Sequence, residues 1–277
     1  MTVSNHHYLN NQAIGIFDSG VGGLSIAQQI SKQLPNEQLI YVADSDYAPY
    51  GDISNDKIIQ RVNIIADWLV QKQCKAIVLA CNTATVNAID QLRKRLSIPI
   101  IGVEPAIKPA ALKSNTKKIG ILVTQATANN KRFLALVERY KNGAEVYVQP
   151  CLGLVELIEN GQQTSFKCQQ LLRKYLAPLI EKNVDTLVLG CTHYPFATQL
   201  IKDIMTSKVT LMETAAPVSE QLERQLIKHQ LLSNTPQSVV HKFYSSSEND
   251  KQSEIFSQLW GEKINLELFN KTNKLNK

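Results

Sequence analysis

The sequence lacks the features of several protein classes. No apolar run among its 277 residues approaches the roughly 20 residues that a membrane-spanning helix needs, so no membrane partner is expected. Its five cysteines include no CxxC pair, which disfavours a disulfide framework or a zinc site and suits a reducing cytoplasm. Residues 1–12 lack the apolar core of a signal peptide. These absences predict a cytoplasmic protein without a metal, with loose tails at residues 1–12 and 270–277.

The positive charge of the chain has no concentrated patch in the sequence. The formal net charge is +6 and the sequence pI is about 9.0, yet Lys and Arg are scattered. The densest cluster, residues 93–95, lies late in a predicted helix, where cations complement the helix dipole. We therefore expect no nucleic-acid partner. A hydrophobic content of 44% is ordinary for a globular protein, and the length accommodates two domains.

Two similar stretches organise the chain. Residues 76–83 and 186–193 each consist of a short apolar run, a small residue, a cysteine and then polar residues. Such a run is typical of a buried parallel strand, and a helical pattern follows each one. Cys81 and Cys191 are thus predicted at the carboxyl ends of strands, which is where open α/β sheets bind ligands.

The repetition extends beyond these two stretches. Residues 14–17 open a first unit, and the similar residues 119–122 open a second one. One cysteine at the same place in each unit would present two thiols across one cleft. A single buried cysteine is often just a small apolar residue, but a matched placement in two units favours a function.

Strands and helices alternate along the chain, which predicts mostly parallel sheets with helices on both faces. Besides the runs before the two cysteines, the expected strands are residues 13–17, 39–43, 100–103, 118–123, 144–149, 208–212 and 239–243. The expected helices are residues 24–34, 55–73, 83–96, 126–140, a helix capped by Thr164 that runs to Asn183, 195–205, 215–229 and 250–260. The apolar face of the second helix is assigned to packing: Ile58, Ile59, Val62, Ile65, Ala66, Leu69 and Val70. We expect the last segments to return to the first unit.

A glycine-rich turn, Asp18-Ser19-Gly20-Val21-Gly22-Gly23, follows the first strand. Its glycines let backbone N–H groups approach an anion at a helix N-terminus. The alternative is dinucleotide binding, since Asp44 ends the next strand at a fitting distance, but Ser25 stands where the third glycine of that fingerprint belongs. In the loop that follows, Tyr50 beside Gly51 is either a loop anchor or a residue that faces a ligand.

On these motifs the chain resembles the glutamate racemases of the cofactor-independent aspartate/glutamate racemase superfamily. The similar segments are residues 18–23, Pro49-Tyr50-Gly51, residues 80–84 and residues 190–195, in the right order over most of the chain. The resemblance implies two similar three-layer α/β domains with mostly parallel sheets, related by a pseudo-two-fold axis. Residues 1–103 and 216–277 would form the domain that carries Cys81, and residues 104–215 the domain that carries Cys191. The active site would lie in the interdomain cleft.

The resemblance also implies the activity. The enzyme would be an isomerase that interconverts L- and D-glutamate without a cofactor and supplies D-glutamate for peptidoglycan synthesis, as a homodimer. Cys81 and Cys191 would be catalytic. The implied substrate-binding residues are Asp18, Ser19, Tyr50, Gly51, Asn82, Thr83, Thr192 and His193. His193 favours glutamate, because aspartate-specific relatives usually carry an acidic residue there.

Three further positions bear on the resemblance. Glu159 either matches a second-tier acidic position of the family or is a surface charge of a helix. Leu152 follows Cys151 where the family often has proline, and Asn130 stands where it often has serine. Both departures concern the wall of the second domain.

Thiols suit the implied chemistry, because inversion at the α-carbon needs a base on one face and an acid on the other. A free cysteine has a pKa of roughly 8.5, and a helix N-terminus lowers it, so lowered thiol pKa values are expected at both cysteines. Two other functions stay open at this point: a one-thiol decarboxylase or isomerase, and a binding protein that keeps the fold. Ser25 disfavours a nicotinamide enzyme, and no pyridoxal phosphate fingerprint is present, so no cofactor is expected.

Overall fold

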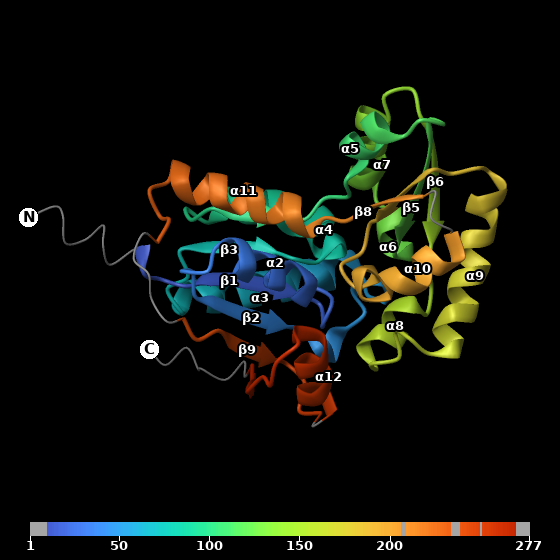
Figure 1. The fold of residues 1–277 in the computed structure, drawn as a ribbon. Helices are drawn as coiled ribbons and strands as arrows, with labels where there is room; N and C mark the ends of the chain where they lie inside the picture. Colours follow the sequence, from blue (N-terminus) through green and yellow to red (C-terminus); the bar gives the residue numbers. More distant parts are fainter. Residues whose placement is uncertain (1–9, 206–208, 234–238, 250, 270–277) are drawn as a thin grey trace, which may run out of the picture.

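The computed structural model describes residues 10–205, 209–233, 239–249 and 251–269. In this part of the chain, two parallel sheets lie side by side, each covered by helices (Figure 1). We call the six-stranded sheet with its helices the first unit and the four-stranded sheet with its helices the second unit.

The first unit is built on a sheet of order β10-β9-β2-β1-β3-β4. Its strands are β1 (Ile14–Asp18), β2 (Leu39–Ala43), β3 (Ala76–Leu79), β4 (Ile100–Gly102), β9 (Lys242–Ser245) and β10 (Leu266–Leu268). The neighbouring strands β2, β1 and β3 are short, mostly apolar runs in which every residue is buried, as is typical of parallel strands between helices. β9 and β10 come from the end of the chain and extend this sheet beyond β2.

Helices cover both faces of the first sheet. They are α2 (Leu24–Gln33), α3 (Asn55–Gln71), α4 (Asn82–Arg95), α11 (Ala215–Lys228) and α12 (Lys251–Trp260). Side chains alternate between the two faces, so Ile16 and Val78 pack under α2, α11 and α12, whereas Phe17 and Leu79 pack under α3 and α4. On α3, Ser54 is the N-cap and most of the predicted apolar face is buried, but Val70 is 40% exposed.

The second unit repeats this arrangement on a sheet of order β6-β5-β7-β8. Its strands are β5 (Lys118–Val123), β6 (Glu145–Pro150), β7 (Thr186–Leu189) and β8 (Thr210–Met212). Its helices are α5 (Ile107–Lys113), α6 (Gln125–Ala128), α7 (Lys131–Tyr140), α8 (Leu154–Glu159), α9 (Phe166–Glu181) and α10 (Thr198–Met205). Three short 3-10 turns complete the described elements: η1 (Ser45–Tyr47), η2 (Tyr50–Asp52) and η3 (Tyr194–Ala197).

The two units place their cysteines identically. β3 pairs with β1 so that Leu79 lies opposite Phe17, and β7 pairs with β5 so that Leu189 lies opposite Leu122. One residue later, the Ala80 N–H donates to the Phe17 carbonyl at 2.7 Å, and the Gly190 N–H donates to the Leu122 carbonyl at 2.8 Å. Cys81 and Cys191 each come next, at the carboxyl edge of their sheet. The predicted α/β architecture and this placement are therefore confirmed.

Several predicted elements differ from the structure. The expected helix 126–140 is two helices, because Asn130 caps α7 and interrupts the first turn. Ser165 rather than Thr164 caps α9, and η3 precedes α10 where one helix from residue 195 was expected. The expected strand 239–243 is β9, whose residues are 242–245. α5 and β10 were not predicted, and most of the predicted tails, with Lys208 and Asp250, lie outside the described residues.

None of the described helices is long and apolar enough to cross a membrane.

Candidate active site

Cys81 is the N-cap of α4 and lies 5% exposed at the carboxyl edge of the first sheet. Its Sγ accepts a hydrogen bond from the Ala84 N–H at 3.4 Å and lies 3.5 Å from Ser19 Oγ. Burial and the nearby charge of Asp18 raise the pKa of the Cys81 thiol to about 12, although the bonds from Ser19 and Ala84 oppose this. The expected lowering by the helix N-terminus is therefore wrong, because the loss of solvation outweighs one N–H donor.

Cys191 lies 6% exposed at the equivalent edge of the second sheet. Its Sγ is 3.6 Å from His193 Nδ1, and the opposite ring nitrogen, Nε2, lies 2.5 Å from Glu159 Oε1. Burial lowers the pKa of His193, but the bonds to Cys191 and Glu159 raise it, and its pKa stands well above the ordinary value of 6.5. The His193 ring thus lies between the sulfur of Cys191 and the carboxyl group of Glu159.

Asp18 links the two cysteine sites. It is fully buried at the end of β1, where its Oδ1 accepts from the Gly20 N–H at 2.8 Å and its Oδ2 accepts from the Thr192 hydroxyl at 3.1 Å. Burial raises the pKa of Asp18 to about 6, against the opposing charge of His193. A charge on Cys191 in turn raises the pKa of Cys81, so the two thiols lie within electrostatic range of each other.

Backbone N–H groups of the glycine-rich turn donate hydrogen bonds to carboxylates of the chain itself. Besides the Gly20 N–H bound by Asp18, the Val21 N–H donates to Glu159 Oε1 at 2.9 Å. A Cβ on Gly20 would lie 1.8 Å from Glu159 Oε1, and a Cβ on Gly22 would lie 2.4 Å from His193 Nδ1. The glycines therefore admit side chains of the second unit, which is a use of this turn that the sequence did not indicate.

Asn82 and Thr83 follow Cys81 at the start of α4. Asn82 is 3% exposed, yet neither Oδ1 nor Nδ2 has a hydrogen-bond partner. An unpartnered buried amide is costly in a native structure, so the Asn82 side chain has hydrogen-bonding capacity that the protein itself does not use. Thr83 Oγ1 lies 3.1 Å from Thr124 Oγ1 and 3.3 Å from Thr127 Oγ1. These two hydroxyls of the second unit were not identified from the sequence.

Tyr50 is buried, and its hydroxyl donates to Asp44 Oδ2 at 2.6 Å, so the side chain anchors its loop. Arg61 binds the same carboxylate, which leaves Asp44 unavailable to a dinucleotide ribose. Gly51 faces the second unit, since a Cβ there would lie 3.6 Å from Thr124 Cβ.

Two positions depart from the pattern of the family that the sequence resembles. Asn130 caps α7, and its side-chain amide donates to Asn87 Oδ1 at 3.4 Å. Leu152 is 58% exposed.

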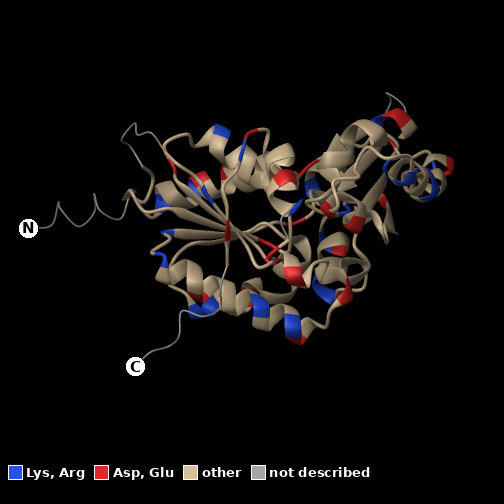
Figure 2. Cartoon of the chain, turned by 90° about the horizontal axis from the view of Figure 1, so that it is seen from below, with Lys and Arg blue, Asp and Glu red and all other residues tan. Residues whose placement is uncertain are grey.

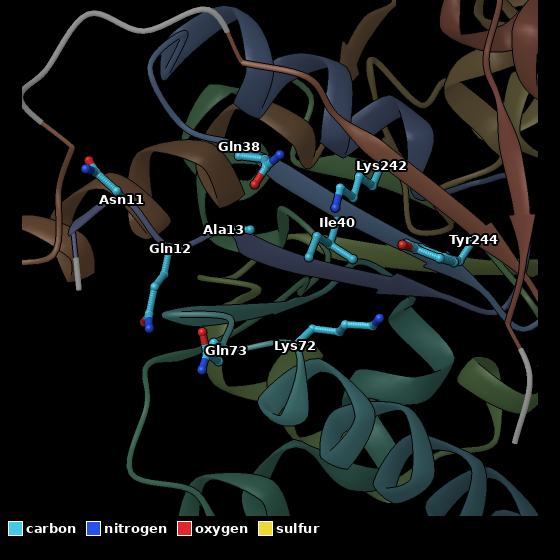
Figure 3. A pocket seen from close by; sticks show the side chains of 9 residues that line it. All are labelled: Asn11, Gln12, Ala13, Gln38, Ile40, Lys72, Gln73, Lys242 and Tyr244. Carbon is cyan, nitrogen blue, oxygen red and sulfur yellow. The ribbon is translucent and has the colours of Figure 1, made fainter. Parts of the chain in front are cut away.

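Other features of the described chain lie apart from these residues. A cavity of about 400 Å³ opens at the amino ends of β1, β2 and β9, with Lys72, Lys242 and several amide side chains around it (Figure 3). Lys and Arg lie on helices of both units (Figure 2).

Among the residues that the structure describes, no group of three or more His, Cys, Asp or Glu side chains could hold a metal ion.

Comparison with known proteins gives consistent matches. The protein family described as Asp/Glu/Hydantoin racemase matches residues 14–219. The glutamate racemase of Pseudomonas aeruginosa strain PAO1 is 42% identical over 254 residues, which cover 91% of this chain and 96% of that protein.

Solved structures match over the same extent. Glutamate racemase isoform RacE1 from Bacillus anthracis superimposes with a TM-score of 0.85 at 30% identity, covering 94% of this chain and 98% of that one. The glutamate racemase of Francisella tularensis in complex with D-glutamate gives a TM-score of 0.84 at 30% identity, covering 96% and 100%.

Proposed function

Because the chain belongs to the Asp/Glu/Hydantoin racemase family, we propose that it is a cofactor-independent glutamate racemase with Cys81 and Cys191 as its two acid–base groups. The observation that carries the proposal is the matched placement of the two thiols, one after β3 and one after β7, in equivalent registers. The substrate is taken from the relatives, which are named glutamate racemases, and one of them holds D-glutamate.

The reaction conserves atoms and electrons without a cofactor. Cys191, as thiolate, takes the α-proton of L-glutamate, and the electron pair of the broken C–H bond moves into the α-carboxylate. The Cys81 thiol, which burial keeps protonated, delivers its proton to the opposite face and gives D-glutamate. The reverse reaction exchanges the two roles. Acid–base groups of this kind typically contribute ~10²–10⁴-fold each.

The neighbouring residues supply binding and proton control in this proposal. His193, held by Glu159, lies beside Cys191 Sγ and assists its proton transfer. Asp18 and Ser19 lie beside Cys81 and receive the substrate ammonium. Asn82, Thr83 and Thr192, with the Tyr50–Gly51 backbone, bind the carboxylates, and the free amide of Asn82 is the group with unused hydrogen-bond capacity.

The wider role extends the same proposal. D-Glutamate would serve peptidoglycan synthesis in the cytoplasm, and the protein would be a homodimer, which light scattering tests. We also propose the domain division at residues 103 and 215, supported by the place of β9 and β10 in the first sheet and by α11 against the sheet face that α2 covers. Limited proteolysis should cut first near these boundaries; first cuts inside either unit would contradict the division.

The activity has a direct test. Dialysed, metal-free protein should convert either enantiomer of glutamate to the racemate, read by optical rotation, and should act poorly on aspartate. A protein that is inert on both enantiomers would refute the proposal, and binding of NAD by that inert protein would favour the nicotinamide alternative.

The division between the thiols needs a second assay. Racemisation has an equilibrium constant of one, so the ratio of kcat/KM in the two directions is fixed in any variant and cannot reveal which thiol serves which enantiomer. Glutamate analogues with a leaving group at the β-carbon avoid this limit, because elimination needs one proton abstraction only. Cys81→Ser should keep elimination from the L-analogue and lose it from the D-analogue, and Cys191→Ser should do the reverse. Loss of the same enantiomer in both variants would contradict opposed thiols.

A further inference from the structure

We infer that Arg61 is a positioning residue of the proposed active site, which holds the Tyr50–Gly51 turn in place through the carboxylate of Asp44. The inference rests on the proposed function and adds a residue of α3 that lies outside the turn and strand-end motifs of the site.

Arg61 and Asp44 form a buried, two-point ion pair. Arg61 Nε donates to Asp44 Oδ2 at 2.8 Å, and Nη2 donates to Oδ1 at 2.5 Å. The side chains are 1% and 0% exposed. A buried carboxylate is stable only with a partner charge and filled hydrogen-bond positions, and Arg61 provides both.

The same pair fixes both 3-10 turns of the loop. The Tyr50 hydroxyl, in η2, shares Asp44 Oδ2 with Arg61. The guanidinium carbon of Arg61 lies 4.1 Å from the ring centre of Tyr47, in η1, a distance at which a cation is attracted to a ring face. This combination needs the flat, forked guanidinium, which a lysine cannot reproduce.

The turn that is held in this way touches both halves of the site. The Tyr50 side chain belongs to the same apolar cluster as Cys81 and Ala84. Gly51 lies against Thr124 of the second unit, beside the hydroxyl pair of Thr83 and Thr124. A shift of the turn would therefore move the wall next to Cys81 and the contact between the units together.

The charge of Arg61 also matters at this edge of the sheet. The Asp44 N–H donates to the Asp18 carbonyl at 3.0 Å, so the two aspartates end adjacent strands. Without Arg61, the buried carboxylate of Asp44 would have no partner charge, one strand away from the buried carboxylate of Asp18. Arg61 therefore balances the charge as well as holding the turn.

The test compares Arg61→Lys and Tyr50→Phe with the wild type. Both variants should raise the KM for glutamate about tenfold, the size of one weakened charged hydrogen bond, with kcat changed much less. Amide hydrogen exchange over residues 45–52 should be about tenfold faster in both. Arg95→Lys is the matched control, because the Arg95–Asp67 pair also joins an arginine to α3 but lies on the surface; it should change neither quantity.

The outcomes separate this inference from the proposed function. A racemising wild type whose Arg61→Lys form keeps both its KM and its exchange rates would overturn the inference alone. A wild type that does not racemise glutamate would refute the proposed function, and the exchange rates would still decide whether Arg61 holds the turn. If Arg61→Lys does not fold, Tyr50→Phe decides by the same two measurements, and a loss confined to kcat would count against positioning.

Discussion

Glu159→Gln should destabilise the positive charge on His193 without moving the His193 ring. In the wild type, the His193 ring lies between Cys191 Sγ and Glu159 Oε1, and the carboxylate also accepts the Val21 N–H. The amide oxygen of glutamine can still accept from Val21. The variant therefore removes the negative charge beside the imidazolium with little change of shape.

The magnitude follows from the burial of the pair. The side chains of His193 and Glu159 are 3% and 13% exposed, so solvent screens them little. A hydrogen bond to a charged group is worth about 1.5–3 kcal/mol. The bond to Glu159 and its negative charge are among the causes that raise the pKa of His193, so the substitution should lower that pKa.

The sign of the pH dependence follows from the raised pKa of His193. A base whose pKa is raised by folding stabilises the native state fully below its unfolded pKa and loses that contribution as the pH rises through the folded value. The wild type should therefore exceed the variant in unfolding free energy by about 2 kcal/mol at a pH near 6, and the difference should shrink at a pH near 9.

Urea unfolding at both pH values measures the difference, and proton NMR of the His193 ring follows its titration. Glu138→Gln is the control, since Glu138 is an exposed carboxylate paired with Lys141 on α7. A gap between wild type and Glu159→Gln that is equal at both pH values, with His193 titrating normally in the wild type, would refute the reasoning.

Three other residues of the site give further tests. Gly22→Ala places a Cβ 2.4 Å from His193 Nδ1, and the displaced ring should cost about 10²-fold in kcat with an unchanged circular dichroism spectrum; full activity would show that the ring has room. Asn82→Leu removes an unpartnered buried amide and should stabilise the free protein by about 1–3 kcal/mol while weakening glutamate binding by calorimetry; a lower unfolding free energy would mean that the amide has a partner. Asp18→Asn should stabilise the protein by about 2–3 kcal/mol at pH 7, because the pKa raised from 3.8 to about 6 makes the ionised form unfavourable above that pH; the gain should vanish near pH 3, and a gain that persists there would contradict it.

The parts of the site that the sequence predicted are those fixed by local pattern. A short apolar run before a small residue was enough to place β3 and β7, and the repeat then placed both cysteines. The motif resemblance named the family that the comparisons show. Asp18, Ser19, Thr192 and His193 gather around the cysteines because they follow the same strand ends.

The parts that the sequence did not predict depend on contacts between distant segments. Arg61 lies on the apolar face of α3, and only the position of Asp44 explains why a charged residue is buried there. The sequence leaves Glu159 as either a surface charge or a site residue, and in the structure it binds the Val21 N–H and the His193 ring. Local periodicity likewise could not show that Val70, near the end of α3, is 40% exposed while most of the other apolar residues of that face are buried.

The two units place their cysteines alike but surround them with different side chains. Equivalent registers place Cys81 and Cys191 alike, but Cys81 has the hydroxyl of Ser19 beside it whereas Cys191 has the imidazole of His193. Two bonds that tune these environments cross between the units, from Thr192 to Asp18 and from the Val21 N–H to Glu159. They exist only while the units are in contact, so the protonation pattern of the site belongs to the joined pair of units and to neither sheet alone.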